Sequence, residues 1–101
     1  MGAIIAPAEF VLVFRGWHKR RVRVVLTSRS VNFGVFGVVG TANDNGDFGI
    51  LISESDAISL SIAGCGCAFA DETQDVFGFR VESGLIAVRE DFNICVMLLA
   101  E

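Results

Sequence analysis

The chain has 101 residues and a formal net charge of −4, with 52% hydrophobic residues and 11 Gly in addition. An ordinary soluble domain carries about 45–50% of its residues in hydrophobic types and Gly together. This composition excludes an intrinsically disordered chain, and no apolar run approaches the ~18 residues of a membrane span. A length near 100 residues predicts one globular domain over 1–101, with no room for a second module.

The cysteines and the first residues bear on the compartment. Three Cys, of which Cys65 and Cys67 are one residue apart, do not form a disulfide framework, and reduced thiols are typical of the cytoplasm. The first ten residues lack the basic start and long apolar core of a secretory signal. We therefore expect a cytoplasmic protein.

Residues 8–19 are compatible with either a helix or a strand. Pro7 and Glu9 suit the first turn of a helix, and apolar residues recur with helical spacing at Phe10, Val13, Phe14 and Trp17. Ala6 is a poor N-cap, and the β-branched residues favour a strand. The sequence leaves both possibilities open.

The next segments alternate with the period of two that a half-buried strand requires. In residues 20–28, Val22, Val24 and Leu26 face one way and the basic residues face the other. Residues 31–39 are apolar on both faces and contain Gly at intervals of three, which indicates bends or close backbone approach. Asn45-Gly46 then predicts a hairpin turn before a strand over 48–52.

Further alternation predicts strands in the second half of the chain. Ile58, Leu60 and Ile62 alternate with Ser, Phe77 to Val81 alternates similarly, and small residues over 63–68 would let a strand bend. Turn residues at 83–84 and 90–91 delimit strands near 85–89 and 93–100. We predict a mainly β domain, a small antiparallel barrel or sandwich of about seven strands, with residues 8–19 as its one candidate helix.

One short segment resembles a known family. Val22-x-Val24-x-Leu26, followed by Val31 and Gly34, is similar to the first half of an Sm-like small barrel, over about fifteen residues. The resemblance implies a barrel. It does not carry over the RNA-binding residues of that family, because the corresponding strand reads Phe-Gly-Ile-Leu over 48–51 and Arg89 is followed by Glu90 rather than Gly.

A basic stripe is the clearest candidate for binding a polyanion. Residues 1–40 have a net charge of +5 and residues 41–101 have −9, and the strand over 19–29 holds most of the cations. Such a patch binds phosphates whatever the net charge of the protein, although the stripe itself holds a single aromatic residue for base stacking. A solvated outer face or an acidic neighbouring subunit explains it as well. The candidate binding residues are Arg15, Trp17, Lys19, Arg21 and Arg23.

Catalytic and metal chemistry have weaker signals. His18 is the sole His, and with Cys65, Cys67 and Cys95 it would complete a Cys₃His zinc set, but C-x-C departs from the usual C-x₂₋₄-C spacing. The Asn- and Asp-rich turn over 43–47 lacks the final carboxylate of a calcium loop. No phosphate-binding or nucleophile motif occurs. We expect no catalytic residue, metal or cofactor, with an enzyme using His18 and the cysteines as an alternative.

The apolar surplus indicates a second covered surface. A domain of this length buries only about 60–70% of its unfolded surface, so these residues exceed the need of one core. Residues 31–39 or the C-terminal strand, through Ile94, Val96 and Leu98, are candidates for an interface between copies. We therefore expect a non-enzymatic binding module that forms a homo-oligomer. An oligonucleotide-binding barrel and a barrel for a small apolar ligand are the alternatives.

Overall fold

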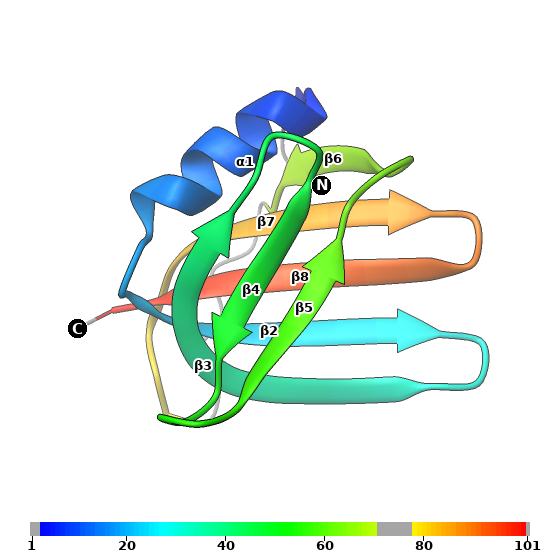
Figure 1. Ribbon diagram of the computed structural model, residues 1–101. Coiled ribbons are helices and arrows are strands. Elements are labelled where there is room, and N and C mark those ends of the chain that lie inside the picture. Colours follow the sequence, from blue (N-terminus) through cyan, green and yellow to red (C-terminus); the bar gives the residue numbers. More distant parts are fainter. Residues whose placement is uncertain (1–2, 71–77, 101) are drawn as a thin grey trace.

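The computed structural model describes residues 3–70 and 78–100, which form one helix and eight strands (Figure 1). The elements in chain order are β1 (Ile4–Ile5), α1 (Pro7–Gly16), β2 (Arg21–Ser28), β3 (Asn32–Ala42), β4 (Asp47–Leu51), β5 (Ala57–Ser61), β6 (Gly66–Phe69), β7 (Val81–Arg89) and β8 (Phe92–Leu99). The prediction of a mainly β domain is confirmed.

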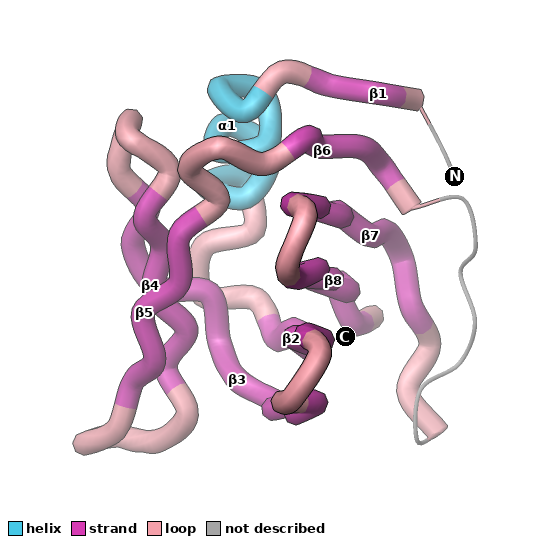
Figure 2. Tube along the Cα trace, turned by 90° about the vertical axis from the view of Figure 1, so that its right-hand side faces the viewer, coloured by secondary structure: helices cyan, strands magenta, loops and turns pink. Residues whose placement is uncertain are grey.

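All eight strands belong to one antiparallel sheet with the order β1-β6-β7-β8-β2-β3-β4-β5. The sheet curves strongly, so that β4 and β5 stand across from β7 and β8 (Figure 2). Within the described residues no strand pairing joins the two ends of the sheet at β1 and β5. Closure into a barrel therefore stays a prediction.

The helix resolves the alternative left open for residues 8–19. Pro7 occupies the first helical turn, where its missing N–H costs nothing, and Ala6 offers no side-chain cap. The rings of Phe10 and Phe14 are buried and pack on Phe48 of β4, with centroids 6.0 and 4.7 Å away. The helix thus covers the concave side of the sheet and forms because its apolar face is buried there.

Glycines allow β3 to pair with β2 along its first part and with β4 along its last part. A Cβ on Gly37 would lie 2.4 Å from Ile50 and 2.7 Å from the backbone oxygen of Leu51, so only Gly permits this approach of β3 to β4. Gly46, in the following turn, has φ of +92°, as the Asn45-Gly46 pair predicts. The expected bend and hairpin are both confirmed.

Two expectations about strands differ from the structure, and part of a third lies outside the described residues. Strands β1 and β6 were not predicted, because two apolar residues and a run of small residues give no alternation to recognise. Ser83 and Gly84 do not separate two strands but lie inside β7, next to an irregularity in its pairing with β8. Phe77, at the start of one predicted strand, lies outside the described residues.

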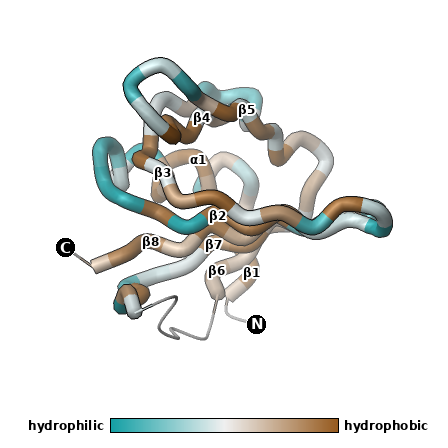
Figure 3. The backbone as a smooth tube through the Cα atoms, turned by 90° about the horizontal axis from the view of Figure 1, so that it is seen from below, coloured by the Kyte–Doolittle hydropathy of each residue, from teal (hydrophilic) through white to brown (hydrophobic). Residues whose placement is uncertain are grey.

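Hydrophilic residues concentrate in the turns and at the start of β2, whereas the strands are mostly hydrophobic (Figure 3). The core contains no buried charged side chain among the described residues. The charged side chains of the described residues therefore lie outside the buried core.

Candidate functional site

The outer face of β2 and β3 carries a cluster of two arginines and two phenylalanines. The guanidinium carbon of Arg21 lies 5.1 Å from the ring centre of Phe79, and that of Arg23 lies 4.6 Å from Phe36. The two rings are 5.6 Å apart. A guanidinium on a ring face is attracted by the ring quadrupole. The cluster therefore presents fixed cationic groups at the surface.

A groove of about 320 Å³ lies beside this cluster, with Phe36, Leu51, Ile52 and Phe79 among its walls. We call it the arginine groove, lined by Arg21, Phe36, Leu51, Ile52 and Phe79, with Arg23 stacked on Phe36 at its border. The side chains of Leu51 and Ile52 are 48% and 43% exposed. An exposed group of large apolar residues next to arginines is typical of an interaction surface.

Strand register sets the order of charges around the groove. Arg21 is paired with Val38, Val38 with Leu51, and Leu51 with Ala57, so these four residues form a row across β2, β3, β4 and β5. With strands about 4.8 Å apart, the row spans about 14 Å. The exposed turn between β4 and β5, at the far end of the row, holds Glu54 and Asp56. The surface is thus cationic at one side, apolar in the middle and acidic at the other.

The other residues of the predicted basic patch lie elsewhere. Trp17 is buried at 8% exposure and packs on Phe14, so its inclusion in an exposed patch is wrong: helical spacing turns it toward the core. Arg15 donates from Nε to the carbonyl oxygen of Ala42 at 2.9 Å and pairs with Asp44 at 3.0 Å, tying the helix to a turn. Lys19 is exposed, with φ of +66°.

The predicted interface residues of β8 belong to the core. Ile94, Val96 and Leu98 are at most 4% exposed, because alternate residues of β8 face the inside of the curved sheet. In the single chain these three side chains are therefore taken up by the core and expose almost no surface to a second copy. The outer face of β8 instead carries half-buried Cys95 and Met97.

His18 and the cysteines do not converge. Nδ1 of His18 lies 3.0 Å from the carbonyl oxygen of Gly40, whereas Cys67 faces the core and Cys95 the outer side of the sheet. Burial raises the pKa of the Cys67 thiol, and the nearby Cys65 adds to this, so the reactive thiolate is disfavoured. Over 3–70 and 78–100, no group of three His, Cys, Asp or Glu is placed to hold a metal ion.

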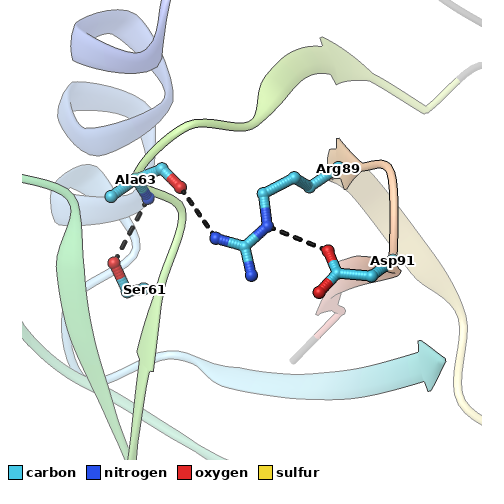
Figure 4. Close-up of polar contacts among 4 residues, drawn as sticks. All are labelled: Ser61, Ala63, Arg89 and Asp91. Carbon is cyan, nitrogen blue, oxygen red and sulfur yellow. Dashed lines mark hydrogen bonds and ion pairs between the residues drawn. The ribbon is translucent and has the colours of Figure 1, made fainter.

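A second recess lies at the opposite end of the strands, between β5 and the turns of the β2-β3 and β7-β8 hairpins. We call it the serine pocket; it has a volume of about 460 Å³, and its polar walls are Ser28, Ser59, Ser61, Arg89 and Asp91. Arg89 reaches across the open side of the sheet toward the segment after β5 (Figure 4). Side chains rather than strand pairing bridge this side.

Comparisons of the chain with protein-family models, with curated proteins and with solved structures give no match. In the part of the chain that the structure describes, no helix has the length and apolar character to cross a membrane.

Arg21 and Arg23 are predictable from the sequence, whereas the partners that define the groove are not. Phe36 lies in the apolar strand and Phe79 in a distant segment, and neither has a local signal for function. The contact between Arg23 and Phe36 follows only from the strand register, which places the two residues opposite each other on the exposed face. Ser59 and Ser61 are the polar half of an alternating strand, which predicts solvent exposure but no pocket.

Proposed function

We propose that the chain is a non-enzymatic binding module, a partly open small barrel, that associates with a second copy of itself through the arginine groove. The observation that carries the proposal is the order of groups along the row from Arg21 to Ala57: cations, apolar residues, then the acidic turn. The groove includes Phe36, and so retains residues 31–39 as the interface expected from sequence.

A two-fold axis through the middle of this row makes the surface self-complementary. In a two-fold dimer, residue i of one copy meets residue j of the other and the reverse also holds. Rotation about an axis between Val38 and Leu51 brings Arg21 of one copy to the turn with Glu54 and Asp56 of the other, twice. The exposed apolar strips then cover each other. Charge complementarity and apolar burial thus favour the same arrangement.

The stacked guanidinium groups favour a protein surface over an oligonucleotide. Bases bind to single-stranded nucleic-acid sites by stacking on aromatic faces. Here Arg23 lies over Phe36 and Arg21 over Phe79, so each ring already has a guanidinium on one face. Arg21 remains suited to a carboxylate, which accepts two parallel N–H bonds from one guanidinium.

The test uses two oppositely charged variants and their mixture, with mass measured by analytical ultracentrifugation over a range of concentrations. Variant one carries Arg21→Glu and Arg23→Glu, and variant two carries Glu54→Arg and Asp56→Arg. Each alone places like charges together, so we expect the dimer dissociation constant to rise at least about tenfold. The equimolar mixture restores opposite charges at both contacts and should form a heterodimer. Higher salt should weaken the wild-type dimer.

Arg29→Glu, a charge reversal at an exposed residue outside the groove, serves as the matched control and should leave the dimer intact. A wild-type chain that stays monomeric at all concentrations would refute the proposal. So would two variants that dimerise as tightly as the wild type. If the monomer instead binds oligo(dT) or a fatty-acid probe and variant one loses that binding, the groove serves one of the alternative functions.

A further inference from the structure

The serine pocket lies away from the arginine groove and has a different charge pattern. Nε of Arg89 donates to Oδ1 of Asp91 at 3.0 Å, and Nη1 donates to the carbonyl oxygen of Ala63 at 3.5 Å (Figure 4). The guanidinium carbon also lies 4.3 Å from the ring centre of Phe92. Three contacts therefore hold Arg89 in place, and Arg89 in turn fixes one oxygen of the Asp91 carboxylate.

The charges around this pocket cancel. Arg89 and Asp91 line it, and the adjoining hollow of about 440 Å³ adds Arg29 and Glu90. Two cations and two anions at one rim give an ionic ligand as much repulsion as attraction. The hydrogen bond from Arg89 lowers the pKa of the Asp91 carboxyl, with a further backbone hydrogen bond acting in the same direction. The carboxylate thus stays an acceptor at neutral pH.

The remaining polar groups suit hydroxyl partners. Ser61 Oγ accepts a bond from the Ala63 N–H at 3.2 Å, which leaves its hydroxyl hydrogen to donate to a ligand. Ser59 is exposed and points to the same side of β5. Ser28 is used within the wall, because its hydroxyl bonds both the N–H and the carbonyl of Val31. Oδ2 of Asp91 lies on the side away from the Arg89 Nε contact and is available to accept a hydrogen bond from a ligand hydroxyl.

The pocket also offers an apolar surface, to which Leu60 and Ile94 contribute. A ligand that fits must be neutral, must both donate and accept hydrogen bonds, and must have an apolar face. A volume near 460 Å³ is within the range of about 300–1,000 Å³ that small-molecule sites occupy. From this combination we propose that the serine pocket binds a neutral saccharide, with hydroxyls on Ser59, Ser61 and Asp91. This site is independent of the proposed dimer.

The experiment is a titration followed by amide shifts in two-dimensional NMR spectra. The neutral probes are methyl glucopyranoside, methyl mannopyranoside and ribose, and the charged probes are glucuronate and glucosamine. We expect at least one neutral probe at millimolar concentration to shift the amides of residues 59–61 and 91–92, and the charged probes to bind no more tightly. Ser61→Ala and Asp91→Asn should each weaken binding about 3- to 10-fold, since the first removes a ligand hydrogen bond and the second replaces a charge-assisted hydrogen bond by a neutral one.

Ser55→Ala is the matched control, because Ser55 is an exposed hydroxyl in the turn after β4 and does not line the pocket. It should leave the affinity unchanged. The proposal is overturned if none of the neutral probes shifts these amides, or if Ser61→Ala and Asp91→Asn bind as the wild type does. Tighter binding of a charged probe would also overturn the proposal, because two cations and two anions at the rim should favour a neutral ligand.

Discussion

The inner and outer faces of β2 are formed by alternating residues of one segment yet differ in chemistry, and the inner face continues onto β8. On the inner face, Val22, Val24 and Val96 have no exposed surface. On the outer face of β2 stand Arg21 and Arg23, stacked on phenyl rings. The inner face therefore contributes most to stability, while the outer face carries the groups of the proposed dimer contact. Moving a substitution by one residue along a strand should therefore change its main effect from one on stability to one on the outer surface.

The largest expected effect is from a charge placed on the inner face. Val96→Asp would bury an unpaired carboxylate and should destabilise the fold by more than about 4 kcal/mol, in effect unfolding it. Val88→Asp, on the outer face of β7 with the side chain 40% exposed, should cost no more than about 1 kcal/mol. Circular dichroism with urea denaturation measures both. Equal losses would contradict the division between the faces.

Two glycines of β3 allow the same comparison without introducing charge. Gly37→Ala directs a methyl group at buried Ile50 and at the backbone of Leu51, and should destabilise by about 1–3 kcal/mol. The three atoms nearest to a Cβ on Gly34 all belong to the guanidinium of Arg23, a flexible side-chain end that can shift at the cost of its stacking on Phe36, so we expect Gly34→Ala to change stability by no more than about 1 kcal/mol. Thermal unfolding of the two variants gives the difference. A more harmful change at Gly34 would contradict the assignment of rigid and adaptable neighbours.

The smallest effect concerns an outer ion pair. Arg89 holds the pKa of the Asp91 carboxyl below its ordinary value of 3.8, chiefly by a hydrogen bond. Because the folded-state pKa is the lower one, the pair stabilises the fold above the unfolded pKa, and this contribution is lost as the pH falls through the folded pKa. Asp91 is fully exposed, so the thermodynamic effect is minor. Carbon NMR should give a midpoint below 3.8 in the wild type, and a higher midpoint in Arg89→Ala. An unchanged midpoint would exclude the hydrogen bond as the cause.

Local sequence patterns predicted the structure correctly where a single physical requirement, such as strand alternation or a positive φ, acts on neighbouring residues. The alternation of Val22, Val24 and Leu26 gave a strand with a basic outer face, and Asn45-Gly46 gave a turn. Interface residues were not predictable in this way. The C-terminal strand is apolar on both faces, and its sequence does not state which face is inside, so Val96 was assigned to an interface although it lies in the core.

The sequence by itself determined a mainly β domain, the turn at Asn45-Gly46 and the cationic face of β2, because these depend on the period of side chains along a strand and on backbone conformations that Gly permits. Only the tertiary structure decided that a helix, Pro7–Gly16, begins this region and that Phe79 meets Arg21. It also decided that Arg89 bridges the open side of the sheet. These features depend on contacts between segments distant in sequence, whose pairing follows from burial of the whole core rather than from any local pattern.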